Sequence, residues 1–203
     1  MNESAREVVS ISTPVADSHG VRWLSAWTVG LVVATAVILR LMGQPLWCKC
    51  GEWSPWSWDI WSSHNSQHLI DPYTFTHVVH GLILCGLVYW LPRSVPDGIR
   101  YLATVVLEAG WEILENSPLI IERYREATIS QDYFGDSVAN SVGDILACVV
   151  GYGIALRLRT VKSLMSIAAT ELILVITIRD CLILNIIMLV WPIEAIKQWQ
   201  LPG

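Results

Sequence analysis

Apolar residues fall in long blocks along this chain, and shorter polar segments separate them. A helix needs about 20 such residues to cross a bilayer. The blocks therefore predict five membrane-spanning helices, at about 23–42, 74–91, 98–116, 136–157 and 163–191. The last block is too short for two crossings, so it predicts one long tilted span or a span followed by an interfacial helix. The predicted fold class is all-α: a single polytopic helix bundle.

The first apolar block also allows a cleaved signal peptide, because Ala34 and Ala36 form a small-residue pair of the kind found at cleavage sites. Against this, the polar lead at 1–20 is long, and the apolar run continues after Ala36 with no polar region. We therefore favour a retained span.

Composition supports a membrane protein. Charged residues make up 15% of the 203 and hydrophobic residues 53%, whereas an average soluble protein has about 25% charged residues. The mean hydropathy is +0.47. Eleven Trp and six Tyr stand against two Phe, and Trp and Tyr favour the membrane–water interface. A net charge of −5 leaves no basic patch for a nucleic-acid backbone.

The short turns between the predicted spans carry basic residues and almost no acidic ones: Arg93 and Arg100 in one turn, and Arg157, Arg159 and Lys162 in the other. Cytoplasmic loops carry such an excess. The N-terminus is therefore expected inside. The Trp-rich loop 43–73 and the charged loop 117–135 are expected outside.

Polar side chains inside the apolar blocks follow helical spacing. Three groups each share one face of a helix: Glu108, Glu112 and Glu115; Asp136, Asn140 and Asp144; and His77 with His80. A rise of about 1.5 Å per residue places all of them, and Arg179, in the outer part of the bilayer. A charge at the bilayer centre costs about 2.5–3.5 kcal/mol. These groups should therefore converge on one pocket open to the outer face.

Small residues recur at every fourth position beside the acidic face of the fourth block: Ala139, Gly143, Ala147, Gly151 and Ala155. Small residues at this spacing allow two helices to approach closely. We expect a neighbouring helix to pack tightly there.

The pocket is a candidate for acid–base chemistry, since clustered acids and imidazoles in a dry site separate their pKa values. Glu112 or Asp136 is the candidate base, with His77 or His80 as its partner. The candidate binding residues are Glu108, Glu115, Asn116, Arg123, Asp132, Asn140, Asp144 and Arg179. Arg123 could anchor an anionic headgroup. A solvated loop in which it pairs with Glu122 or Glu126 is the alternative.

His64 and His68 lie one helical turn apart in the outer loop. Together with His77, His80 and the glutamates they could ligate a divalent metal. A hydrogen-bonded network explains the same residues without an ion. Cys48 and Cys50 are too close for an unstrained disulfide, and no second cysteine pair completes a metal site, so we expect them to be structural or incidental.

The whole chain resembles a bacterial inner-membrane protein family of unknown function. The segments that carry this resemblance are WSSHNSQH at 61–68, WEILEN at 111–116, DYFGDSVANSVG at 132–143 and PIEAIKQW at 192–199. It implies a bacterial cytoplasmic-membrane location and no particular reaction.

The region 112–143 also resembles the VanZ-like membrane proteins, whose pattern runs acid, Arg, Asp, Asp, Asn, Gly. The matching residues are Glu112, Arg123, Asp132, Asp136, Asn140 and Gly143. The His-rich loop, Glu108 and Asp144 depart from that pattern.

Three functions remain open from the sequence: an enzyme acting on a lipid-linked or amphiphilic anionic substrate at the outer leaflet, a proton- or cation-coupled transporter or flippase, and a non-catalytic envelope assembly protein. A transport path needs polar groups across the whole bilayer, and the inner half offers little beyond Glu171. This favours a one-sided site. The lipid bilayer is the expected partner and nucleic acid is not. The oligomeric state stays open.

Overall fold

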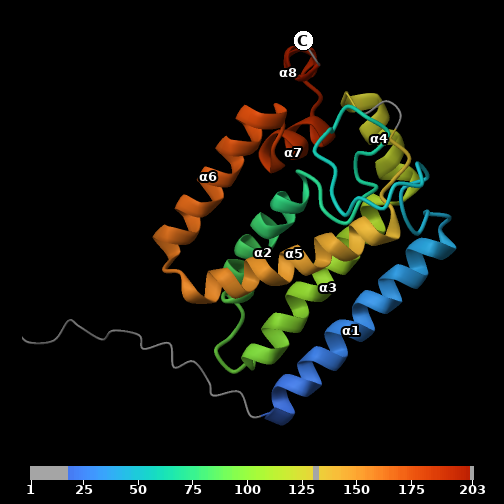
Figure 1. Ribbon diagram of the computed structural model, residues 1–203. Helices are drawn as coiled ribbons and strands as arrows, with labels where there is room; N and C mark the ends of the chain where they lie inside the picture. Colours follow the sequence, from blue (N-terminus) through green and yellow to red (C-terminus); the bar gives the residue numbers. More distant parts are fainter. Residues whose placement is uncertain (1–17, 130–132, 202–203) are drawn as a thin grey trace, which may run out of the picture.

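A computed structural model describes residues 18–129 and 133–201 of the chain. Within them the protein is all helical (Figure 1), which confirms the predicted fold class. The eight helices are α1 (Ser18–Leu41), α2 (Thr74–Val88), α3 (Asp97–Glu115), α4 (Pro118–Ala127), α5 (Val138–Arg157), α6 (Thr160–Ile178), α7 (Leu182–Val190) and α8 (Glu194–Gln200). Among the described residues no sheet forms, and one isolated bridge joins Trp56 to Ile70.

Three helices, α1, α5 and α6, are long and apolar enough to cross a membrane, which indicates a membrane protein. The apolar helix α2 is shorter, with 15 residues. The helix α3 has 19 residues but carries five ionisable side chains: Asp97, Arg100, Glu108, Glu112 and Glu115. Of the five predicted spans, three therefore correspond to described helices that are long and apolar enough to cross a membrane.

The last apolar block is broken, which decides between the two predicted alternatives. The helix α6 ends at Ile178, and Arg179 adopts a left-handed conformation with φ 55°. The candidate span α6 is thus followed by the short helices α7 and α8 instead of continuing as one long helix. Glu171 stabilises this break, because its carboxylate accepts the backbone N–H groups of Leu182 (3.1 Å) and Ile183 (2.9 Å) at the start of α7.

The centre of the bundle is the contact of α5 with α2, and α3 packs against both (Figure 1). A Cβ atom on Gly151 would lie 2.1 Å from the backbone oxygen of Val78, and one on Gly143 would lie 2.1 Å from that of Leu69. Real Cβ atoms do not approach so closely. The expected close packing of a neighbouring helix is confirmed at Gly151, which contacts α2, whereas Gly143 contacts Leu69 of the loop 43–73.

The turn between α2 and α3 is held by one buried guanidinium. Arg100 is 4% exposed. It donates hydrogen bonds to the backbone oxygens of Val88 (2.5 Å), Pro92 (2.8 Å) and Val95 (3.1 Å). The guanidinium adds to the turn's own hydrogen bonds, in which the backbone N–H of Leu91 donates to Val88 and that of Val95 donates to Pro92.

The opposite end of the bundle is covered by the loop 43–73 and by α4, α7 and α8 (Figure 1). The segment 117–135 is not wholly a loop as predicted, because α4 begins at Pro118 after the extended Ser117. Proline is favoured at the first helical position because it lacks an N–H that would be unpaired there anyway.

Candidate functional site

Acidic side chains of α3 face the interior at the end of the bundle that the loop 43–73 covers. Glu108 and Glu112 are one turn apart and buried, and Glu115 is partly exposed. The opposite face of α3 exposes apolar residues, including Leu107. The helical spacing predicted from the sequence therefore turns the three acids towards α2 and α5.

Two imidazoles of α2 meet the first of these acids. Nδ1 of His77 lies 2.5 Å from Oε1 of Glu108, and Nδ1 of His80 lies 3.1 Å from the same oxygen. Hydrogen bonds to an ionised carboxylate are short and strong. When Nδ1 of a neutral ring donates, its Nε2 carries a free lone pair. Glu108 therefore orients both rings and leaves both Nε2 atoms as acceptors or ligands.

A second group joins His77 to Glu112 and to Asp144 of α5. Nε2 of His77 lies 3.8 Å from Oδ2 of Asp144, and its Nδ1 lies 3.4 Å from Oε1 of Glu112. Glu112 is 0% exposed, yet neither of its carboxylate oxygens accepts a hydrogen bond. Oδ1 of Asp144 is also without one. Burial of an unpaired carboxylate is costly, so this group needs a proton or a cation.

A third group lies between α3 and the residues before α5. The hydroxyl of Tyr133 donates to Oδ1 of Asp136 (2.8 Å), and Nδ2 of Asn116 donates to Oδ2 (3.1 Å). The backbone N–H of Asp136 donates in turn to Oδ1 of Asn116 (2.7 Å). Glu112, Glu115 and Asp136 each offer an oxygen, and the three oxygens lie within 4.8 Å of one another.

The loop residues of this group have strongly shifted pKa values. Burial raises the pKa of Asp136 to about 7, although hydrogen bonds from Tyr133 and Asn116 favour its charged form. Burial also raises the pKa of Tyr133 and Tyr124 well above the ordinary phenol range. Both phenols therefore act as neutral donors, and the Tyr124 hydroxyl donates to Oε1 of Glu115 at 2.9 Å.

These groups border a cavity of about 70 Å³, which has room for an ion or a few water molecules. Its polar wall includes His77, His80, Glu115, Asp136, Asn140, Asp144 and Asp180. Its apolar wall is formed by Ile129, Leu182, Ile186 and Leu189. Neither Lys nor Arg occurs among the described residues that line it.

Several predicted site residues lie elsewhere. Arg123 donates to the backbone oxygen of Leu189 (2.7 Å), close to the end of α7. Arg179 donates to that of Leu201 (2.6 Å), beyond α8. Neither arginine lines the cavity. Asp132 lies outside the described residues.

Asn140 lines the cavity and also ties it to the loop above. Its Nδ2 donates to the backbone oxygen of His68 (2.8 Å), and its backbone N–H donates to Oγ of Ser137 (3.1 Å), which caps α5. Ser137 donates in turn to the backbone oxygen of Gln67 (3.0 Å). The loop thus covers the start of α5.

Several cavity residues were missed from the sequence, among them Tyr73 and Asp180. The hydroxyl of Tyr73 donates to Oδ2 of Asp180 at 2.9 Å, and both side chains line the cavity. Asp180 comes from beyond the break that follows α6. No helical spacing relates it to the acids of α3 and α5, so the sequence carried no signal for its position.

The two histidine pairs belong to different clusters. Nδ1 of His64 lies 3.1 Å from Nε2 of His68 and 3.7 Å from Sγ of Cys48. His64 and His68 group with Cys48 and Cys50, whereas His77 and His80 group with the acids. The prediction that all four histidines and the glutamates could bind one metal ion is therefore wrong, because the structure places the two histidine pairs in separate clusters.

Residues 39–202 match a family model described as "Protein of unknown function (DUF2585)". The chain belongs to this family. That confirms the resemblance of nearly the whole chain to an uncharacterised bacterial family. The likeness to VanZ-like proteins remains a prediction.

Curated relatives cover most of the chain and of their own length. A UPF0314 protein of Rhizobium meliloti (strain 1021) is 46% identical over 178 residues, covering 88% of this chain and 90% of the relative. A UPF0314 protein of Sphingopyxis alaskensis is 45% identical over 181 residues, covering 89% and 95%. One of Paracoccus denitrificans is 43% identical over 175 residues, covering 86% and 91%. No solved structure matches the chain.

Proposed function

We propose that this protein is a membrane enzyme that binds a divalent cation on His77, Glu112 and Asp144 and acts on an amphiphilic, anionic substrate. The observation that carries the proposal is the fully buried carboxylate of Glu112, whose two oxygens accept no hydrogen bond. Buried charges are normally paired or bound to a metal. No Lys or Arg lines the described cavity to provide the pairing.

The donor set suits such an ion. Imidazole nitrogens and carboxylate oxygens are common ligands of Zn²⁺ and Mn²⁺. A metal-binding histidine usually donates its other ring N–H to a carboxylate or carbonyl. His77 does so to Glu108 at 2.5 Å, and its Nε2 faces Asp144. Glu108 would thus position the imidazole ligand.

The two walls of the cavity favour an amphiphilic substrate. The cavity itself has room for the ion and a small anionic group, so the hydrocarbon part would lie outside it, where Ile186 of the apolar wall is 51% exposed. The cation would bind the anionic headgroup, which the acidic wall alone would repel. Asp136, held by Tyr133 and Asn116, is the candidate base beside it.

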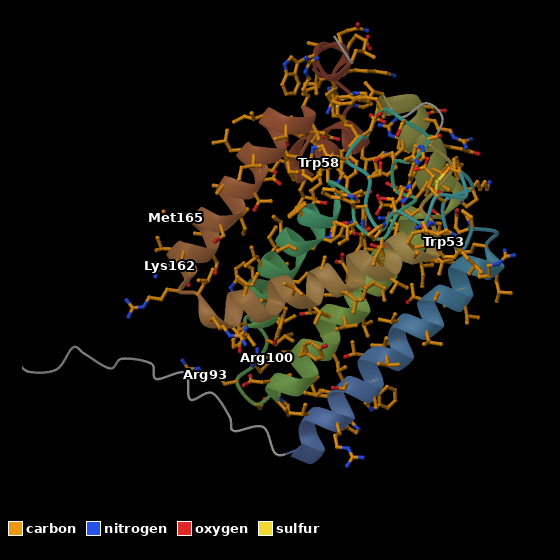
Figure 2. All side chains as sticks on the ribbon, viewed as in Figure 1. Trp53, Trp58, Arg93, Arg100, Lys162 and Met165 are labelled. Atoms are coloured by element: carbon orange, nitrogen blue, oxygen red, sulfur yellow. The ribbon has the colours of Figure 1, made fainter. Side chains whose placement is uncertain are left out.

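We place this cavity at the outer face of a bacterial cytoplasmic membrane, with α1, α2, α3, α5 and α6 as the five spans and the N-terminus inside. Figure 2 shows Arg93, Arg100 and Lys162 at the end of the bundle away from Trp53 and Trp58. Basic residues favour the cytoplasmic side and Trp favours the interface. Both tendencies support this orientation.

The packing of the other half of the bundle favours an enzyme over a transporter. Below the histidines, the described interior is filled by Cys85, Val88 and Tyr152. The one buried guanidinium there, Arg100, is engaged by turn carbonyls. A transport path would need polar groups through this layer.

Metal binding provides the first test, with Mn²⁺ as the probe because it prefers oxygen and imidazole donors. The full chain, purified in detergent, should bind one Mn²⁺ by calorimetry. Glu112→Gln should weaken that binding at least about tenfold, since the oxygen lost is a direct ligand. The exposed Glu122 on α4 gives the matched control, and Glu122→Gln should bind like the wild type. Unchanged affinity in Glu112→Gln would refute the cation site.

Activity is tested separately on cell lipids. Mass spectrometry of whole lipid extracts should show the same accumulated amphiphile in a deletion strain and in a strain carrying Asp136→Asn. The Glu122→Gln strain should match the wild type. A wild-type profile in both the deletion and Asp136→Asn strains would contradict an enzyme of this kind.

A further inference from the structure

We propose that Cys48, Cys50, His64 and His68 form a four-ligand zinc site that fixes the loop above the carboxylate cavity. One ligand atom from each of the four residues lies within 4.8 Å of the other three. Two thiolates and two imidazoles are a common donor set of closed, structural zinc sites. The site shares no residue with the cation site proposed on His77, Glu112 and Asp144.

The distances fit a tetrahedral ion. Zinc bonds of about 2.0–2.1 Å to nitrogen and about 2.3 Å to sulfur imply ligand separations of about 3.3 Å for two nitrogens and about 3.6 Å for nitrogen and sulfur. Nδ1 of His64 lies 3.1 Å from Nε2 of His68 and 3.7 Å from Sγ of Cys48. The cluster is already near the size that one ion requires.

The surroundings of the ligands orient them inward. Nδ1 of His68 donates to the backbone oxygen of Ser54 at 2.6 Å, which leaves its Nε2 lone pair facing the cluster. Both sulfurs accept backbone N–H groups at 3.4 Å: Cys50 donates to Sγ of Cys48, and Glu52 donates to Sγ of Cys50. Such N–H groups stabilise a thiolate more than a thiol, because they favour the charged form.

Proton balance distinguishes the two states of the cluster. Without an ion, one imidazole N–H spans the 3.1 Å between His64 and His68. When Zn²⁺ binds, the two thiol protons go to solvent. The ring proton of His64 exchanges to Nε2, so both imidazoles bind as neutral ligands.

The site would hold the cover of the cavity in place. The backbone oxygen of the ligand His68 accepts Nδ2 of Asn140 (2.8 Å), and that of Ser66 accepts the backbone N–H of Ser137 (2.9 Å). Ser66 lines the cavity and adopts an uncommon left-handed conformation with φ 57°. The proposed ligands His64 and His68 lie two residues before and two residues after Ser66. A metal bound to both would keep the turn at Ser66 in its observed conformation.

Metal analysis of the full chain in detergent tests the proposal. Protein loaded with Zn²⁺ and passed over a desalting column should retain one zinc ion per chain more than Cys48→Ser/Cys50→Ser protein treated in the same way. Co²⁺ in its place should give the visible bands of a tetrahedral complex and ultraviolet thiolate-to-cobalt charge transfer. Cys48→Ser/Cys50→Ser should lose the charge-transfer band at least tenfold, while the matched control Cys85→Ala, a buried thiol of α2, should keep it.

A second measurement needs no variant. In the zinc-loaded wild type, iodoacetamide should label Cys50 only after a chelator has been added, as mapped by mass spectrometry. Equal labelling of Cys50 with and without zinc would overturn the site, as would cobalt spectra without charge transfer. Glu112→Gln should leave the charge-transfer band unchanged, so failure of the cavity ion and failure of this site are distinguishable.

Discussion

The two halves of the α2–α3–α5 interface are built from the same helices but in opposite ways. In the pocket half, defined by His77, Glu108, Glu112 and Asp144, acids crowd together and two carboxylates have unpaired oxygens. In the turn half, defined by Cys85, Val88, Arg100, Tyr152 and the contact of Gly81 with Gly151, apolar side chains pack and the buried charge is fully bonded.

This difference separates the residues that stabilise the fold from the residues that are available to bind a ligand. Close backbone contact and a satisfied guanidinium make the turn half rigid. The pocket half gathers charges that oppose folding unless something binds to them. Functional sites commonly reduce stability in this way. Variants in the turn half should therefore destabilise the protein strongly, and variants in the pocket half should change ligand binding more than stability.

The largest effect is expected for Gly151→Ala. Its Cβ would lie 2.1 Å from the backbone oxygen of Val78, so α2 and α5 would have to move apart. The free energy of unfolding, measured in detergent by denaturant titration, should fall by about 3 kcal/mol. Gly86→Ala on α2 is the control, because its Cβ meets no atom within 4 Å. Equal stability of the two variants would show that the helices are not tightly packed there.

The next largest effect is expected for Arg100→Leu. The backbone oxygens of Leu91 and Val95 would lose the side-chain donor that Arg100 provides. Those of Val88 and Pro92 would each lose one of their two donors. We expect a loss of about 2 kcal/mol in the free energy of unfolding. The exposed Arg159 offers a charge-matched comparison, and Arg159→Leu should change stability by less than about 0.5 kcal/mol. If both substitutions cost the same, the turn half does not depend on this guanidinium.

Helical spacing explains how much of the pocket could be predicted. The register of Glu108 and Glu112, and that of Asp144 on α5, placed each acid on an inward face. An even rise per residue also put acids and histidines at one level of the bilayer. Those two regularities suffice for helices that pack side by side, and they hold for α2, α3 and α5.

Outside the helices no regular spacing relates one residue to another, so the sequence could not predict which side chains meet there. Thirteen residues separate Cys50 from His64, and no period connects them, so two halves of one cluster looked unrelated. Arg123 looked like an anion ligand, and Arg179 like a further binding residue, because a sequence does not show which backbone carbonyls these side chains bind. The left-handed Arg179 breaks the last block without Gly or Pro, the usual signals for such a break.

The smallest change in the free energy of unfolding is expected for Glu112→Gln in the pocket half. The direction of that change is the informative part of the result. Substitution removes one of several acids that crowd His77, so in the presence of a chelator the variant should be as stable as the wild type or more stable, by up to about 1 kcal/mol. Saturating Mn²⁺ should reverse the order, because an ion that binds only the folded wild type stabilises it by mass action. Thermal unfolding of both proteins with and without Mn²⁺ gives the four values needed. If Glu112→Gln were destabilised as strongly as Gly151→Ala under chelation, the acids would be part of the structural core, and the contrast between the two halves would fail.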